Sequence, residues 1–304
     1  MDNCIHSRTF DRLPIDKFID SLTARNYSYK SINSYRNALD RLIDYLELQE
    51  VFRVQDVTLN HLESYRLSLI DRELSNATQY LYLRCARFFF GYLEETHQVF
   101  INPALNLVIP KYKRKLQQVP SVDDIKRLLD QPDITTPTGI RDKAFLETVY
   151  SCGLRREEAV FVNLSDPDLK QGLLKVNGKG DKERVLPIGD IAKYWIEKYL
   201  IDARPQLLKN PKEEALWLSE RGLRLSYSTV DKLVTRYALS AGITSQFSTH
   251  SLRRACATHM LNNGAHPLDI QMLLGHSELK SLSQYLKVTI KDMKAMHERS
   301  RPGQ

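Results

Sequence analysis

The sequence predicts a mainly α-helical protein with a small β-sheet, divided into two domains. A length of 304 residues exceeds the usual size of one domain, so two cores are expected. Apolar residues recur with a helical period over most of the chain, and two short alternating segments flank a single glycine-rich turn. We place the first domain at residues 1–110, a linker at 111–120 and the second domain at 121–304.

Four helices joined by short polar turns are expected in the first domain. The first follows Pro14, a favourable first-turn residue, and repeats apolar side chains from Ile15 to Leu22. The second covers residues 35–46, the third begins at a Thr58 cap and the fourth begins near Ser75. The aromatic run at residues 88–90 in the fourth helix is interpreted as core rather than as a platform for stacking bases.

Residues 102–120 lack helical periodicity and contain three prolines, which indicates a linker. Four cations lie close together in this segment: Lys111, Lys113, Arg114 and Lys115. Such a connector suits a path along a phosphate backbone. A simply solvated connector is the alternative, and the segment by itself does not distinguish the two.

The second domain is expected to open with a helix capped by Ser121, which has Asp124 at the third helical position. A further helix covers residues 139–152 and ends at Gly153. Residues 173–176 and 183–187 are predicted as strands around the turn 178–181. This arrangement places Lys179 at or beside a hairpin tip.

Helices are expected again at residues 190–203, 226–241 and 249–263, with a short strand at 216–219. The third of these is capped by Ser248 or Thr249 and stopped by Gly264. His250 and Arg253 stand three positions apart on it and therefore share one face. A last pair of helices flanks residues 275–276, and its second member contains Tyr285.

Composition restricts the class of function. A net charge of +7 and a pI near 9.1 favour a polyanionic partner, although a solvated basic surface explains the charge equally well. Four widely spaced cysteines indicate neither a zinc site nor a disulfide framework. No apolar run is long enough to span a bilayer, and the polar start does not resemble a secretory signal, so we expect a cytoplasmic protein without a membrane partner.

Five ordered segments carry a resemblance to a known family: residues 152–160 (CGLRREEAV), 176–187 (VNGKGDKERVLP), 250–259 (HSLRRACATH), 274–276 (LGH) and Tyr285. In this order and spacing they resemble the signature of tyrosine recombinases, and the Xer and transposon integrase branch is the most similar. The resemblance implies a four-helix core-binding domain of the SAM-like type and a tyrosine recombinase catalytic domain, which together form a C-shaped clamp on double-stranded DNA.

The chemistry of strand cleavage agrees with the roles that this resemblance implies. A phosphodiester gathers negative charge in its displacement transition state, and two fixed guanidiniums, Arg155 and Arg253, suit a clamp on it. Tyr285 is the implied nucleophile, which must lose a proton whose free pKa is about 10. His250 is implied as the base that assists this loss.

The resemblance assigns three further residues. Lys179 is implied as the general acid that protonates the departing 5′ oxygen, provided that neighbouring cations lower its pKa. His276 resembles the second histidine of the family, which hydrogen-bonds a phosphate oxygen, and Glu158 resembles the acidic residue that braces the active-site arginine and histidine. A covalent phosphotyrosine route needs neither a metal nor another cofactor, and no metal-ligand motif or Walker loop is found in the sequence.

The basic residues after Tyr285 are predicted to form a helix whose apolar positions are Val288, Ile290, Met293 and Met296. By resemblance this helix docks into a neighbouring subunit, giving a homotetramer on paired DNA sites; a solvated tail is the alternative. A second recombinase or an accessory protein is a further possible partner.

Three departures from the Xer pattern influence the biological assignment: Arg254, Gln284 and the pair Leu286-Lys287. They favour integration or excision of a mobile element over the alternative, which is Xer-type resolution of chromosome or plasmid dimers. Two other classes remain: an enzyme like the type IB topoisomerases, which relaxes supercoils, and a DNA-binding protein without catalysis.

Overall fold

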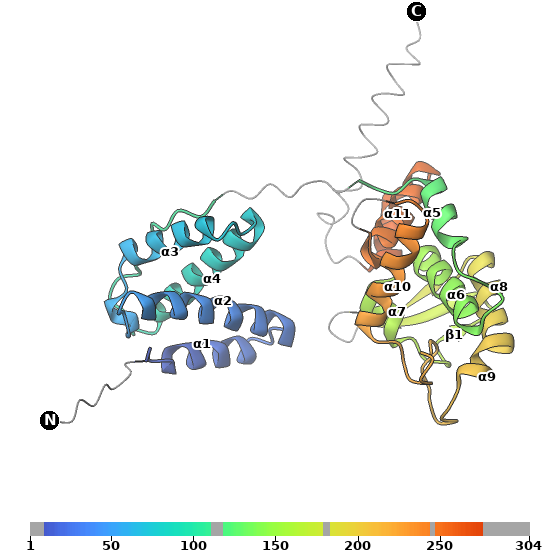
Figure 1. Ribbon diagram of the computed structural model, residues 1–304, viewed down its shortest axis with the longest axis horizontal. Helices are drawn as coiled ribbons and strands as arrows, with labels where there is room; N and C mark the ends of the chain where they lie inside the picture. The colour runs from blue at the N-terminus through green and yellow to red at the C-terminus, as the bar shows by residue number, and fades with distance from the viewer. Residues whose placement is uncertain (1–8, 111–117, 179–182, 244–246, 276–304) are drawn as a thin grey trace, which may run out of the picture. The chain divides into compact units, whose positions relative to one another are not determined.

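The computed structural model describes residues 9–110, 118–178, 183–243 and 247–275, which are drawn in colour in Figure 1. Contacts divide the chain into two compact units, Met1–Lys115 and Leu116–Gln304. The described part is mainly helical and contains one small antiparallel sheet. The predicted fold class is therefore confirmed.

The first unit consists of the four predicted helices: α1 (Leu13–Ala24), α2 (Tyr29–Leu48), α3 (Leu59–Asp71) and α4 (Asn76–Glu95). A 3-10 turn at Val54–Asp56 precedes α3. The Thr58 hydroxyl accepts the N–H of His61 at 3.4 Å, and the Ser75 hydroxyl accepts the N–H of Thr78 at 3.2 Å. Both side chains satisfy an N–H that has no partner within the helix, so the caps fix where α3 and α4 begin.

An aromatic cluster forms the centre of this unit. The ring centroid of Phe18 lies 5.4 Å from those of Phe88 and Phe89, with edge-to-face geometry. Phe90 is completely buried. The aromatic run of α4 is thus core, as predicted, and does not offer free ring faces for bases.

The second unit contains more elements. In chain order they are α5 (Val122–Leu129), α6 (Pro137–Cys152), α7 (Arg156–Phe161), β1 (Pro167–Asp168), β2 (Leu173–Asn177), β3 (Glu183–Pro187), α8 (Asp190–Lys198), a π-helical turn (Tyr199–Ala203), α9 (Arg204–Leu207), α10 (Tyr227–Ser240), α11 (Thr249–Asn262) and α12 (Pro267–Leu274). The long helix α6 packs against α8 and α11 and lies between them in Figure 1. It is the central element around which the other helices are placed.

The sheet has the order β1-β2-β3, and its strands are antiparallel. Lys175 faces Val185 and Asn177 faces Glu183, so β2 and β3 form the predicted hairpin. Leu174 and Val176 are buried and alternate with exposed positions, as the period of two requires. The hairpin tip, residues 179–182, lies outside the described residues.

Two predictions for this unit were wrong. The segment 216–219 is not a strand but makes an isolated bridge between Leu218 and Arg224, because its apolar residues are buried among helices and have no neighbouring strand to pair with. The helix expected at 190–203 is not regular to its end. It widens into the π-helical turn just before Pro205, which has no N–H to donate to the preceding turn.

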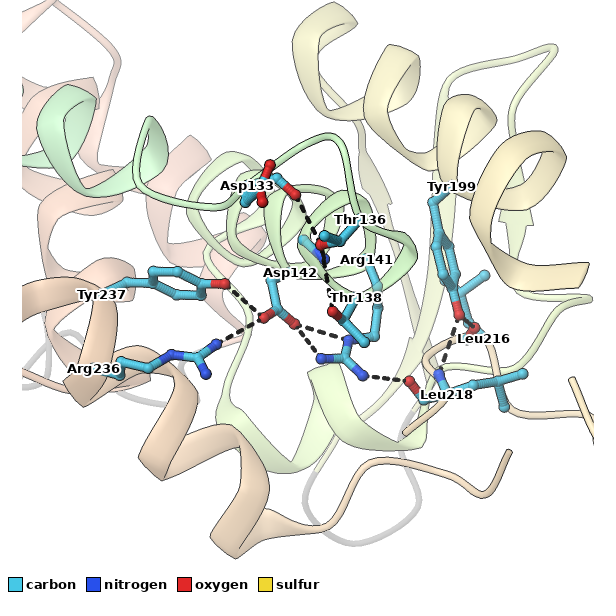
Figure 2. A network of polar contacts seen from close by, with 11 residues as sticks. Asp133, Thr136, Thr138, Arg141, Asp142, Tyr199, Leu216, Leu218, Arg236 and Tyr237 are labelled. Atoms are coloured by element: carbon cyan, nitrogen blue, oxygen red, sulfur yellow. Dashed lines mark hydrogen bonds and ion pairs between the residues drawn. The ribbon is translucent and has the colours of Figure 1, made fainter. Parts of the chain in front are cut away.

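A buried carboxylate connects α6 to α10 (Figure 2). Asp142 is 1% exposed and accepts hydrogen bonds from Arg141 Nε at 2.8 Å, Tyr237 Oη at 2.8 Å and Arg236 Nη2 at 3.2 Å. Arg141 also donates through Nη1 to the carbonyl of Leu218 at 2.8 Å. The charge of Asp142 is therefore matched by groups from two helices.

We expect Asp142→Asn to lower the free energy of unfolding by about 3–5 kcal/mol, because it leaves the buried Arg141 guanidinium without its counter-charge. Urea unfolding followed by tryptophan fluorescence measures this effect, since both tryptophans, Trp195 and Trp217, lie in the second unit.

The matched control is Asp130→Asn, which removes a carboxylate that is 75% exposed and paired with Lys143. Because Asp130 is exposed and Lys143 keeps Glu147 as a second counter-charge at 3.2 Å, we expect a loss of about 0–1 kcal/mol. Equal losses in the two variants would contradict the structural role of Asp142.

Candidate active site

The start of α7 presents the first candidate residue. Gly153 ends α6 with a φ of 59°, a left-handed conformation that favours glycine, and the chain turns there towards α7. Arg155 occupies the N-cap of α7, and its backbone N–H donates to Glu158 Oε2 at 2.8 Å. The carboxylate of the third helical residue thus closes the N-terminus of the helix and orients Arg155.

The side chain of Arg155 contacts the same carboxylate. Its Nη1 lies 2.7 Å from Glu158 Oε1, and its Nη2 donates to the carbonyl of Gly275 at 3.2 Å. The side chain is nevertheless 36% exposed. Arg155 is therefore held from the side of the protein while part of its guanidinium faces solvent.

Arg253 reaches the same place from α11. It is 1% exposed; Nη1 donates to the carbonyl of Gly153 at 2.6 Å and Nη2 donates to the carbonyl of Leu274 at 2.5 Å. Nη1 also lies 3.7 Å from Glu158 Oε2. His250 is exposed and stands one turn earlier on α11, on the face predicted for the pair. The structure therefore brings Arg155, Glu158 and Arg253 together.

A third arginine, which sequence analysis did not assign, completes this cluster. Arg184 of β3 makes a bidentate contact to Glu158, with Nη1 2.7 Å from Oε1 and Nη2 2.8 Å from Oε2. Its Nε donates to the carbonyl of Leu273 at 3.2 Å. A signal was present in the sequence, since Arg184 shares a strand face with the buried Leu186 and a charge on that face needs a partner.

The arginines determine the protonation state of Glu158. Burial alone would raise the pKa of the Glu158 carboxyl, but hydrogen bonds from Arg184 and Arg155 outweigh burial and lower the pKa to about 2. The carboxylate is thus charged at every pH at which the protein would work, and it partly neutralises a cluster of three guanidiniums.

A pH dependence of stability follows. Because the folded pKa of Glu158 lies below its ordinary value of 4.5, its ionised form stabilises the fold by about 3 kcal/mol above that value. This contribution is lost as the pH falls from about 4.5 to about 2. We expect the difference in unfolding free energy between the wild type and Glu158→Gln to be constant near neutral pH and to shrink below about pH 4.5. A difference independent of pH would contradict this account.

Seven of the candidate residues lie outside the described residues. They are Lys179, His276 and Tyr285, together with the linker cations Lys111, Lys113, Arg114 and Lys115. Two of them directly follow described residues: Gly178 precedes Lys179, and Gly275, whose carbonyl contacts Arg155, precedes His276.

Two further side chains of α11, those of Arg254 and His259, bind the first described residues of the second unit. Arg254 Nη2 donates to the carbonyl of Gln118 at 2.7 Å. His259 Nε2 lies 3.0 Å from the carbonyl of Pro120, and its Nδ1 lies 2.8 Å from Tyr150 Oη. A carbonyl only accepts, so Nε2 carries the proton and Nδ1 accepts from Tyr150; burial lowers the pKa of His259 and favours this neutral form. Arg254 and His259 therefore hold residues 118–120 against α11.

A pocket of about 600 Å³ lies elsewhere, beside the Asp142 network, and is lined in part by Arg221, Arg224, Lys232 and Arg236. It has no lining residue in common with the Glu158 cluster. A long polyanion needs an open surface rather than an enclosed cavity, so we place the candidate site at the exposed Arg155. Within the described ranges, no group of three or more His, Cys, Asp or Glu side chains could hold a metal ion. None of the described helices combines the length and apolar character that a membrane crossing requires.

Comparisons with known proteins identify the family. Residues 119–291 match the model of the phage integrase family, and residues 15–98 match that of the phage integrase N-terminal SAM-like domain. The chain is 37% identical to tyrosine recombinase XerD of Proteus mirabilis over 95% of its own length and 92% of that protein.

Two solved structures are similar in fold. One is the XerH site-specific recombinase bound to its palindromic difH substrate, with a TM-score of 0.74 and 20% identity over 96% of this chain and 89% of that chain. The other is a lambda integrase tetramer bound to a Holliday junction, with a TM-score of 0.72 and 18% identity over 90% of this chain and 76% of that chain. Both similarities extend over the two units described above.

Proposed function

This chain belongs to the phage integrase family and is a tyrosine recombinase that cuts and rejoins DNA, and from this premise we propose that Tyr285 is its nucleophile. Tyr285 attacks the scissile phosphate and remains joined to the 3′ phosphate of the cut strand. The arrangement of Arg155, Arg253 and Glu158 carries this proposal. It lies against the carbonyl of Gly275, at the start of the segment that leads to Tyr285.

Arg155 and Arg253 form the clamp on the scissile phosphate. The charge on the equatorial oxygens increases in the transition state, and guanidiniums that are already fixed stabilise it without further reorganisation. The contacts of Arg155 to Glu158 and Gly275 and those of Arg253 to two carbonyls supply this fixation. The exposure of Arg155 supports direct access for a DNA strand.

Proton transfers complete the reaction. His250, exposed on the same helix as Arg253, assists deprotonation of Tyr285, and Lys179 protonates the departing 5′ oxygen. His276 donates a hydrogen bond to a phosphate oxygen. Since the phosphotyrosine bond conserves the energy of the broken linkage, a 5′ hydroxyl of the partner strand reverses the attack, and exchange proceeds through a Holliday junction without ATP or a divalent ion.

The enzyme acts as a tetramer on two DNA sites, with the helix after Tyr285 docked into the next subunit. The lambda integrase relative, which was solved as a tetramer on a Holliday junction, supports this assembly. The apolar positions Val288, Ile290, Met293 and Met296 supply the face that docks.

For the biological role we propose Xer-type dimer resolution first and movement of a mobile element second. The similarity to XerD over 95% of the chain supports the first. Arg254, one of the departures from the Xer pattern, binds the carbonyl of Gln118, so a structural reason accounts for it. Gln284 and Leu286-Lys287 remain as the observations that favour a mobile element.

Covalent capture of DNA tests both the proposed chemistry and the proposed biological role. The protein is incubated with fragmented DNA of its host, the mixture is denatured, and DNA that stays attached to protein is sequenced. We expect attachment at a defined sequence. A single chromosomal locus would support dimer resolution, whereas the ends of an element flanked by repeats would support mobility. Absence of any attached DNA would contradict the proposed chemistry.

A supercoiled plasmid without this sequence distinguishes the recombinase from a topoisomerase. We expect little relaxation, because recombination requires a partner site. Efficient relaxation over many turnovers would instead indicate a type IB activity.

A further inference from the structure

Arg184 differs from Arg155 in how its nitrogens are used and in how far it is exposed. Nε, Nη1 and Nη2 all donate within the protein, to Leu273 and to the two oxygens of Glu158. Its side chain is 16% exposed, against 36% for Arg155. A DNA phosphate would therefore meet Arg155 more readily than Arg184.

Glu158 is a shared acceptor with limited capacity. Its two oxygens receive both terminal nitrogens of Arg184 at 2.7 and 2.8 Å, whereas Arg155 reaches it through Nη1 and its own backbone N–H. Arg253 remains 3.7 Å away and gives its hydrogen bonds to two carbonyls. The bidentate contact to Glu158 thus belongs to Arg184, which is less exposed than Arg155.

Removal of Arg184 would change the contacts of the clamp arginines, Arg155 and Arg253, with Glu158. Glu158 is 2% exposed, and without Arg184 its close ion pair would be that of Arg155 Nη1 at 2.7 Å; the carboxylate would then draw a second N–H of Arg155, and Arg253 from 3.7 Å, towards itself. Each guanidinium that turned to Glu158 would offer fewer N–H groups to DNA. The packing of Arg184 against Gly275 would also be lost; a Cβ at Gly275 would lie 3.1 Å from the Arg184 side chain.

We propose that Arg184 is a positioning residue for strand cleavage: by occupying the Glu158 carboxylate it keeps Arg155 and Arg253 available for the scissile phosphate, without touching the phosphate itself. This inference rests on the proposed clamp function of those two arginines. It assigns to β3 a role in catalysis that is separate from the hairpin tip.

The test is a double-mutant comparison of cleavage rates at saturating enzyme, using a duplex that contains the captured sequence and a nick that prevents religation. Arg184→Met is expected to slow formation of the covalent complex by about 10- to 100-fold, the usual cost of losing an outer partner of a functional group. Adding Glu158→Gln to Arg184→Met removes the uncompensated carboxylate, and we expect the double variant to cleave faster than Arg184→Met alone.

Folding is controlled separately. All rates are measured at a temperature at which tryptophan fluorescence shows each variant to be folded. Arg204→Met is the matched control, because Arg204 is also buried and donates to two carbonyls, those of Glu213 and Ala215, but has no described contact to the Glu158 cluster. It should retain the wild-type cleavage rate. If Arg184→Met does not fold, Arg184→Gln, which is neutral but polar, replaces it with and without Glu158→Gln, and the same order of rates is expected.

Two results would overturn the proposal: a wild-type rate for the folded Arg184 variant, or a double variant no faster than the single one, as expected for a direct phosphate ligand. The wild type reports on the proposed function independently. If it forms no covalent complex, the recombinase chemistry fails; if it does and the variants behave otherwise, only the role of Arg184 fails.

Discussion

Tyr285→Phe is expected to abolish the covalent protein–DNA complex while leaving the affinity for the same duplex unchanged. The phenol oxygen is the proposed attacking atom, and phenylalanine keeps the ring but has no nucleophile, so no other step can compensate. Denaturing electrophoresis of a labelled, nicked duplex measures the complex, and a binding titration at fixed salt measures affinity, which depends strongly on ionic strength.

The matched control is Tyr194→Phe, which removes the hydroxyl of an exposed tyrosine on α8 that has no part in the proposed site. It should form the covalent complex at the wild-type rate. A covalent complex formed by Tyr285→Phe would show that another residue is the nucleophile.

Arg155→Ala and Arg253→Ala are each expected to cost about 3–5 kcal/mol of transition-state stabilisation, by analogy with other electrostatic catalysts. A loss of this size slows single-turnover cleavage by roughly 10²- to 10⁴-fold, since each 1.36 kcal/mol is a factor of ten. The two variants should differ in stability. Arg253 is buried and satisfies the carbonyls of Gly153 and Leu274, so its removal also destabilises the second unit, whereas Arg155 is partly exposed.

Arg254→Ala controls for the loss of a positive charge on α11, because Arg254 Nη2 donates to the carbonyl of Gln118. Cleavage at saturating enzyme should be close to wild type in this variant. Wild-type cleavage by either Arg155→Ala or Arg253→Ala, or an equal loss in Arg254→Ala, would contradict the clamp assignment.

Local signals in the sequence predicted most of the fold. Thr58, Ser75 and Ser121 each mark a helix start, because a side-chain oxygen there satisfies an N–H that the helix leaves free. The alternation in β2 likewise predicts its buried face. The prediction of a strand at 216–219 was wrong because it needed information from remote segments. Whether an apolar run pairs with another strand depends on those segments, which the local periodicity does not describe.

The site could be predicted only in part by the same reasoning. Helical spacing places His250 and Arg253 on one face, but the contact of Arg253 with Gly153 joins residues 100 positions apart, and no local rule predicts it. Only the resemblance to a family predicted that Arg155 and Arg253 share one site. Arg184 was missed because the resemblance assigned it no role and its partner Glu158 lies 26 positions away.

The hydrogen bonds between α11 and residues 118–120 determine where this enzyme can be divided into fragments. A fragment that began at Ser121 would lack the carbonyls of Gln118 and Pro120, which are the acceptors of Arg254 and His259. The same helix carries His250 and Arg253, so a cut at that point would disturb the helix that contains two proposed catalytic residues. A junction placed before Gln118 would keep residues 118–120 with the second unit in a fusion protein. These residues would then still bind α11, the helix that carries Arg253.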